Sequence, residues 1–168
     1  ISKDDELVRE AADLYTEQTG IAIAETQVFG ISERFDWMSA TIDGLNEHGN
    51  IVEFKHITTR RLQELGNEEM EAVPEPWLVQ VHHQMIVAGK SSAEIAVLIG
   101  NEDFRIYPVE RNPDLSDLII TMETEFAEAI RSQTPPEAGP QDVCSTVLRA
   151  YGPPNGAIQL SPDFDEML

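Results

Sequence analysis

Apolar and polar positions alternate with two different periods along this chain, and the changes of period predict where helices give way to strands. Apolar residues three or four positions apart predict four helices, at residues 3–19, 58–65, 77–88 and 113–130. Shorter alternating or continuous apolar runs predict five strands, at residues 21–29, 37–45, 51–56, 94–99 and 104–109. This order predicts a mixed α/β domain with a central sheet flanked by helices.

Residues with known preferences at helix ends mark the limits of these helices. Gly20 ends the first helix, Pro76 opens the third and Gly89 closes it. Asn112 is placed to cap the last helix, with Pro113 at its first position. This helix carries an apolar stripe that we expect to be buried, made of Leu115, Leu118, Ile119, Met122, Phe126 and Ile130.

The composition of the chain changes after residue 132. A linker rich in proline occupies residues 134–140, and a second break follows at residues 152–154. Between them the pattern allows a short helix at residues 142–151, and the last dozen residues are acidic. We therefore expect a folded core at residues 1–132 and a Pro/Gly-rich acidic C-terminal extension at residues 133–168.

A predicted β-hairpin brings together two acidic residues and a lysine. Asp43 ends the first strand, and Glu53 and Lys55 lie on the second. Because side chains alternate between faces of a strand, Glu53 and Lys55 point the same way while Phe54 points into the core. The turn between the strands, residues 46–50, is made of residues that tolerate positive φ angles. The spacing therefore predicts that the three charged groups converge.

Two converging carboxylates bind a hard divalent cation, and a nearby lysine orients or activates a water molecule. This combination is typical of a metal-dependent phosphodiesterase. We expect Lys55 to orient water or stabilise developing charge rather than to act as a free general base. Taken singly, the residues have plainer interpretations: Asp43 as part of a strand-ending turn, and Glu53 with Lys55 as an ion pair worth little at a surface.

The charge balance weakens the interpretation as a nuclease. Thirty-one acidic residues against eleven basic ones give a net charge of −20, whereas a protein that binds DNA usually presents a basic face. An excess of acids with scarce lysine suits a halophilic host. There, salt of about 1 M shortens the Debye length to roughly 3 Å and screens repulsion from phosphates. A strongly solvated acidic surface is the plainer alternative.

Cysteine content and hydropathy restrict the class of protein further. The chain has one cysteine, Cys144, which excludes an internal disulfide, a cysteine-rich zinc site and a four-cysteine iron–sulfur cluster. No apolar run approaches the roughly 20 residues that span a bilayer, and no secretory signal is evident. These features predict a cytoplasmic protein.

Several stretches of the chain resemble a known family of nucleases. Asp43, Glu53 and Lys55 resemble the PD-(D/E)xK nuclease signature, with Ile42 where proline is usual. Further stretches resemble the branch that contains phage lambda exonuclease and the YqaJ-type viral recombinases, at residues 12–20, 40–44, 52–56, 79–85, 96–100, 104–107 and 109–111. The resemblance implies that residues 1–132 form a restriction-endonuclease-like nuclease core, with a central mixed sheet flanked by helices.

The resemblance also implies roles for individual residues. Asp43 and Glu53 would ligate Mg²⁺ or Mn²⁺, with the carbonyl oxygen of Phe54 as a third protein ligand. Lys55 would handle the attacking water, and Gln80 would help hold the site or a substrate phosphate. Members of this branch degrade duplex DNA from an end in the 5′ to 3′ direction for a single-strand annealing protein, and often assemble into rings. We therefore predict a metal-dependent deoxyribonuclease of the phage recombination type.

Two departures from the family pattern keep other functions open. Val8 stands where the family has a metal-proximal glutamate, and no counterpart of the family's DNA-guiding segment precedes the first helix. Val8 and the net charge of −20 favour a catalytically degenerate nuclease fold that serves as a binding or assembly protein or acidic regulator. A nicking or structure-specific endonuclease with the same site is a third hypothesis.

Contacts with DNA phosphates are the least specific part of the prediction. Arg60 and Arg61 begin the helix after the site, and His83 shares a helix face with Gln80. Two solvated arginines are the plain alternative for the first pair. His82, next to His83, diverges from it by roughly 100° around the helix, so we expect it to be packed rather than to share a ligand.

Overall fold

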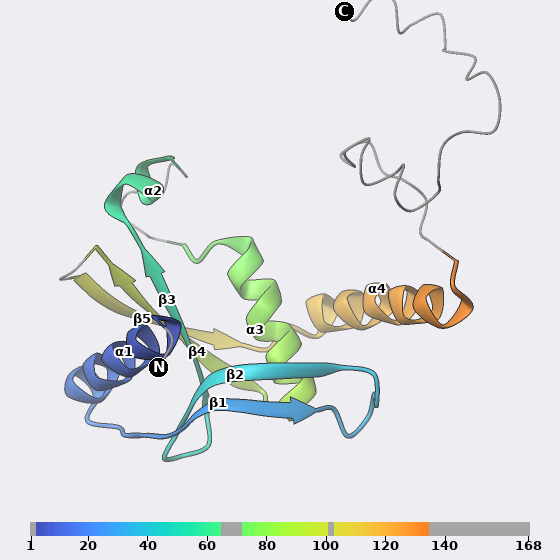
Figure 1. The fold of residues 1–168 in the computed structure, drawn as a ribbon, viewed down its shortest axis with the longest axis horizontal. Coiled ribbons are helices and arrows are strands. Elements are labelled where there is room, and N and C mark those ends of the chain that lie inside the picture. Colours follow the sequence, from blue (N-terminus) through green and yellow to red (C-terminus); the bar gives the residue numbers. More distant parts are fainter. Residues whose placement is uncertain (1–2, 65–71, 101–102, 135–168) are drawn as a thin grey trace, which may run out of the picture. The chain divides into compact units, whose positions relative to one another are not determined.

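The computed structural model describes residues 3–64, 72–100 and 103–134 (Figure 1). In chain order the elements are α1 (Lys3–Thr19), β1 (Ile23–Ile31), β2 (Ser39–Asn46), β3 (Ile51–Ile57), α2 (Thr59–Glu64), α3 (Glu75–Ala88), β4 (Ser92–Ile99), β5 (Asp103–Glu110) and α4 (Pro113–Ser132). The predicted mixed α/β fold is confirmed. Within the described residues, no helix is both long and apolar enough to cross a membrane.

The five strands form one mixed sheet in the order β1-β2-β3-β4-β5. Neighbouring strands run antiparallel except for β3 and β4, which are parallel and are connected through α2 and α3. A parallel pair needs such a crossover because its two strands start at the same end of the sheet. The crossover places α3 beside the central strands.

The central strand β3 has a different helix on each of its faces. Ile51 and Ile57 belong to the cluster of buried residues that includes Val81 and Met85 of α3. Val52 and Phe54 instead pack with Ala11 and Tyr15 of α1. The expected alternation is therefore confirmed: Phe54 enters the core on the α1 side, and the odd-numbered positions of β3 face α3.

Tyr15 anchors α1 to the turn between β2 and β3 and to the neighbouring strand β4. Its hydroxyl donates to Glu94 Oε2 on β4 at 2.5 Å and accepts from Asn46 Nδ2 at 3.3 Å. The other end of the Asn46 amide, Oδ1, accepts from the backbone N–H groups of His48 and Asn50, both at 3.0 Å. Burial and the neighbouring Glu94 raise the pKa of Tyr15 to about 12, so the phenol stays a hydrogen-bond donor.

The ends of the helices follow the expected local chemistry with one shift. α3 begins at Glu75, so that Pro76 occupies its second position rather than its first, and Gly89 ends it with φ of +64°. At the start of α4, Asn112 Oδ1 accepts from the backbone N–H groups of Asp114 at 2.9 Å and Leu115 at 3.2 Å, which confirms the predicted cap.

The prediction that the apolar stripe of α4 is buried is wrong for most of its length. Leu115 and Ile119 pack with Met38, Ile86 and other residues, and Ile119 is buried. The remaining four residues of the stripe are between 55% and 62% exposed: Leu118, Met122, Phe126 and Ile130. Periodicity identifies an apolar face of a helix, but it carries no information on whether another element covers that face.

Contacts between residues divide the chain into two compact units, residues 1–121 and 122–168. The first unit contains the whole sheet, α1 to α3 and the beginning of α4. The extension predicted at residues 133–168 lies outside the described residues except for Gln133 and Thr134, and so does the short helix predicted at residues 142–151. The boundary at residue 132 stays a prediction.

Candidate active site

The hairpin strands β2 and β3 separate just where the two acidic residues lie. Their pairing covers Leu45 with Ile51 and Gly44 with Val52, and one more step in the same register sets Asp43 opposite Glu53. At that step a side-chain hydrogen bond replaces the backbone pairing of the two strands: Asp43 Oδ2 accepts from the backbone N–H of Phe54 at 3.1 Å. This hydrogen bond fixes one carboxylate at the point of separation.

Side chains of α3 cover the edge of β2 that β3 leaves. His83 Nε2 donates to the carbonyl oxygen of Ser39 at 2.9 Å, and Gln84 Nε2 donates to that of Thr41 at 3.3 Å. Alternate carbonyl groups along one edge of a strand point the same way, so two residues of one helix turn satisfy both. The carbonyl groups of Ser39 and Thr41, which β3 does not reach, thereby find partners on α3.

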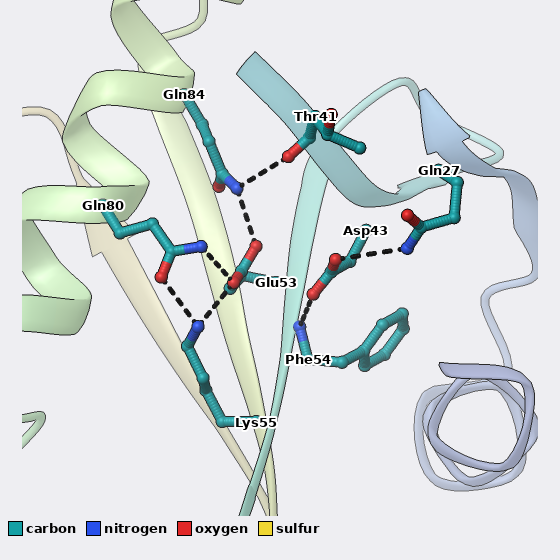
Figure 2. A network of polar contacts seen from close by, with 8 residues as sticks. All are labelled: Gln27, Thr41, Asp43, Glu53, Phe54, Lys55, Gln80 and Gln84. Carbon is teal, nitrogen blue, oxygen red and sulfur yellow. Dashed lines mark hydrogen bonds and ion pairs between the residues drawn. The ribbon is translucent and has the colours of Figure 1, made fainter. Parts of the chain in front are cut away.

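Glu53 is the centre of a hydrogen-bonded network (Figure 2). Its side chain is only 2% exposed. Oε1 accepts from Lys55 Nζ and from Gln80 Nε2, both at 2.6 Å, and Oε2 accepts from Gln84 Nε2 at 2.7 Å. Lys55 also donates to Gln80 Oε1 at 2.7 Å, which closes a triangle of the three groups. A buried carboxylate is stable in such a site because a cation and two amides replace its water.

Asp43 lies in a less complete environment than Glu53. Within the part of the chain that the structure describes, it accepts one hydrogen bond from the Phe54 N–H and a long one, at 3.4 Å, from Gln27 Nε2 on β1. Burial and, to a smaller extent, the negative charge of Glu53 together raise the pKa of Asp43 to about 6, against the opposing effects of the Phe54 N–H and Lys55. Of the two carboxylates, which lie within electrostatic reach of each other, Asp43 is therefore the one whose negative charge is incompletely compensated.

The backbone of β1 is strained opposite Asp43. Gln27 has a φ of +54°, in the left-handed region that residues other than glycine rarely adopt. The β1–β2 pairing is regular on both sides, with Thr26 opposite Gly44 and Val28 opposite Ile42. Strain of this kind costs about 1–3 kcal/mol and clusters at functional sites. Here it directs the Gln27 amide toward the Asp43 carboxylate (Figure 2).

The donor set fits a single hard cation. Gln84 Oε1 is the buried side-chain oxygen that has no hydrogen-bond partner among the described residues, and the same amide holds Glu53. An unpaired buried acceptor in a site that also contains the partly compensated Asp43 is a chemistry that a cation or an ordered water completes. Among the described residues, no group of three or more His, Cys, Asp or Glu side chains is placed to bind a metal, so backbone, amide or water oxygens would supply the remaining ligands.

The structure brings the four predicted catalytic residues Asp43, Glu53, Lys55 and Gln80 into one site, but the other predicted residues do not join its network. Arg60 and Arg61 lie exposed on α2, and His83 bonds to the β2 edge. His82 is packed as expected: it donates through Nδ1 to the Leu78 carbonyl and accepts from the Asn112 N–H.

Sequence reasoning missed two amides, Gln84 and Gln27. Gln84 follows Gln80 by one helical turn, and this spacing, which places both side chains on one face of α3, is a signal that could have identified it. For Gln27 the useful signal would be its left-handed backbone, which a glutamine in an alternating strand pattern does not reveal.

The family's glutamate position on α1 is apolar in this protein. Val8 packs on the cluster formed by Val52, Phe54, Ala11 and Tyr15, so this position of α1 lies over the face of β3 that carries Phe54. The two carboxylates of the candidate site come from the strands, Asp43 from β2 and Glu53 from β3.

The mixed sheet, with Asp43 and Glu53 where β2 leaves β3, defines a nuclease-type α/β fold. Comparison with family models then identifies the family: residues 6–91, just over half of the chain, match the YqaJ-like viral recombinase domain. The chain belongs to the YqaJ-like viral recombinase domain family.

Individual proteins are similar to this chain in sequence or in fold. The uncharacterized protein YqaJ of Bacillus subtilis (strain 168) is 38% identical over 78 residues, which cover 45% of this chain and 24% of that protein. The matched region thus spans about a quarter of the relative's length. An alkaline exonuclease from Laribacter hongkongensis has a similar fold, with a TM-score of 0.65 at 17% identity over 77% of this chain and 67% of that one. A phage-related exonuclease from Haemophilus somnus 129PT also has a similar fold, with a TM-score of 0.54 at 15% identity over 79% of this chain and 72% of that one.

Proposed function

We propose that this domain is a metal-dependent deoxyribonuclease of the phage recombination type, which hydrolyses phosphodiester bonds of duplex DNA from an end in the 5′ to 3′ direction. The observation that carries the proposal is the site at the separation of β2 and β3, where Asp43 lies within electrostatic reach of Glu53 and Glu53 binds Lys55 and Gln80. Membership of the YqaJ-like family and the fold shared with two exonucleases support it.

Asp43, Glu53 and the carbonyl oxygen of Phe54 are the groups that would hold Mg²⁺ or Mn²⁺. When bound, the cation would neutralise charge on the phosphate oxygens and lower the pKa of a water molecule. Its positive charge would also complete the compensation that Asp43 lacks. Asp43 is anchored by the Phe54 N–H, so one of its oxygens stays directed away from the backbone.

Lys55 supplies positive charge to the proposed site, and Gln80 holds it in position. The Lys55 ammonium is held by Glu53 and Gln80, and 20% of its side chain is exposed, so a donor hydrogen can reach an incoming water or phosphate oxygen. Gln80 fixes the ammonium and Glu53 at once, and it is a positioning residue in this mechanism. Arg60, Arg61 and His83 are proposed as weak contacts to DNA phosphates.

A catalytically inactive, DNA- or protein-binding role is the second candidate. Val8 in place of an acid on α1 favours it, and so do the three side-chain donors that already occupy both oxygens of Glu53. A nicking or structure-specific endonuclease would use the same site. The exonuclease proposal further includes a single-strand annealing protein as partner, a ring-shaped homo-oligomer and action in the cytoplasm of the host cell.

The test is cleavage of end-labelled linear duplex DNA with Mg²⁺ across a salt series. We expect the wild-type domain to release nucleotides from ends, the Glu53→Ala variant to be inactive, and the surface variant Asp13→Asn to match the wild type. Circular duplex should survive; its nicking would identify an endonuclease. Inactivity of the wild type at every salt concentration, without stabilisation by Mn²⁺, would support the binding role instead.

A further inference from the structure

A second polar feature of the molecule lies beside the β1–β2 hairpin. An open pocket of about 650 Å³ is lined by residues of β1 and β2, the loop that connects them, the end of α3 and the beginning of α4. It is separate from the Glu53 network, because none of Asp43, Glu53, Lys55 and Gln80 lines it. All of its lining residues belong to the unit formed by residues 1–121.

The charge of this pocket is opposite to that of the chain. Three of the eleven basic residues line it, Arg34, Lys90 and Arg111, against one acidic residue, Glu33. In a chain with a net charge of −20, a local excess of positive charge is unusual. Cations gathered in one concave surface focus their field into it and attract an anion.

Two of the three cations, Arg111 and Arg34, are held by neutral partners. Arg111 donates through Nε to Ser116 Oγ at 3.1 Å, and the Arg34 guanidinium lies 4.9 Å from the centre of the Phe35 ring. No salt bridge within the described residues joins Arg34, Lys90 or Arg111 to a carboxylate. Neutral partners fix the position of the two arginines while leaving their charge available to a ligand.

The rest of the lining suits the other half of a nucleotide. It is mainly apolar, formed by residues that include Val28, Ile31, Phe35, Ile42, Ile86 and Val87. Guanidinium and ammonium groups recognise phosphate oxygens, whereas apolar and aromatic side chains pack against a base or sugar. A pocket with both kinds of surface matches a phosphate-bearing nucleotide better than a simple inorganic anion.

The pocket also adjoins the candidate active site along two elements. Ile42 of the pocket follows Thr41, whose carbonyl group binds Gln84, and Ile86 lies two residues after Gln84 on α3. From Gln80 to Ala88 the helix rises about 12 Å, which is the length of three to four nucleotides of a B-form strand. A strand with one phosphate at Glu53 and Lys55 therefore reaches the pocket within a few nucleotides.

We propose that the pocket lined by Arg34, Lys90 and Arg111 binds a nucleotide unit, with its phosphate on the three cations and its base against the apolar wall. This inference rests on the proposed nuclease function. The nucleotide belongs either to the DNA strand that runs from the active site or to the mononucleotide released there; both present the same chemistry.

The experiment measures binding of a labelled single-stranded oligonucleotide by fluorescence anisotropy, in EDTA to prevent cleavage and across 0.1–1 M KCl. Arg34→Gln/Lys90→Gln is compared with Arg9→Gln/Arg105→Gln, which removes the same charge outside the pocket. We expect the pocket variant to bind at least tenfold more weakly and the slope of log Kd against log salt to fall by about 1.4, at about 0.7 per lost contact. The control should keep the wild-type slope.

Titration with thymidine monophosphate separates the two sources of the nucleotide. Loss of oligonucleotide binding in the pocket variant assigns the pocket to the DNA strand. Loss of thymidine monophosphate binding alone, with oligonucleotide binding unchanged, assigns it to the released mononucleotide. Wild-type binding of both probes by the folded pocket variant would overturn the inference.

Failure of this inference and failure of the nuclease proposal give different results. Cleavage of linear duplex by the wild type, with unchanged nucleotide binding by the pocket variant, would support the nuclease proposal and contradict the role proposed for the pocket. Nucleotide binding that depends on Arg34 and Lys90, in a protein that cuts no DNA, would support the role of the pocket and contradict the nuclease proposal. Thermal unfolding of each variant checks that the fold is retained.

Discussion

The two carboxylates of the site lie on neighbouring strands but in opposite circumstances. Glu53 is buried, and a cation and two amides bind it at 2.6–2.7 Å. Asp43 has one backbone donor at 3.1 Å and one amide at 3.4 Å, and its pKa is raised to about 6. The difference indicates that the protein itself stabilises the charge of Glu53, whereas the charge of Asp43 is stabilised fully only when a further cation is bound.

Loss of either carboxylate should have the largest effect, and it should be the same for both. With Mg²⁺ present, we expect Asp43→Asn and Glu53→Gln each to lower the rate of duplex cleavage by at least about 10³-fold, because in the proposed mechanism each removes a charge that would hold the cation. Single-turnover cleavage of end-labelled DNA measures this. A tenfold loss in one variant and none in the other would show that only one carboxylate takes part.

Stability should separate the two residues. In EDTA at pH 8, Glu53→Gln should destabilise the fold by about 2 kcal/mol, because Lys55 loses its buried partner. Asp43→Asn should stabilise it by about 1 kcal/mol, because the new amide carries no uncompensated charge and still accepts from the Phe54 N–H. Urea unfolding of both variants tests the contrast, which destabilisation of equal size in the two would contradict.

Between about pH 4 and pH 6 the pH dependence of stability should reflect Asp43. Its folded pKa of about 6 lies above its ordinary value of 3.8, so the folded state holds the proton more tightly than the unfolded state. The contribution of Asp43 to stability is therefore greatest below about pH 4 and falls as the pH rises to about 6. Subtracting the metal-free unfolding profile of Asp43→Asn from that of the wild type isolates this change. Mn²⁺ should reverse it above pH 6, since it competes with the proton.

Gln27 offers the smallest effect and the finest test of how Asp43 is held. Gln27→Gly should leave stability within about 1 kcal/mol of the wild type, because relief of the positive φ offsets the lost hydrogen bond. Cleavage should fall only a few-fold, through poorer orientation of Asp43. Gln27→Ala keeps the strain and loses the bond, so it should be the less stable of the two variants. If Gln27→Gly were the less stable of the two, the role assigned to the Gln27 amide would be contradicted.

The sequence was most informative where chemistry is local. The turn at residues 46–50, the Asn112 cap and the Asp43–Glu53–Lys55 spacing each follow from neighbours within about ten residues, and the structure contains all three. Gln80 was placed by resemblance, and it binds both Glu53 and Lys55.

What the sequence concealed depends on distant partners. The spacing of Gln84 from Gln80 places both amides on one face of α3, but it does not show which groups that face meets. The pairing of Gln84 with Glu53 and Thr41 depends on how α3 crosses the separated strands. Likewise, the exposed residues Met122 and Phe126 have the same periodicity as buried Ile119, because the pattern describes a helix face and not its neighbour.

The side chain of Asn46 connects the turn between β2 and β3 to α1 and, through Tyr15, to β4. The same amide closes the tip of the hairpin and contacts Tyr15, which in turn binds Glu94 on the fourth strand. If the tip slipped by a single residue, every side chain of one strand would exchange faces, and Asp43 would no longer lie across from Glu53. The alignment of the two acids is thus set some three residues away, by a neutral asparagine and a tyrosine that take no part in the chemistry.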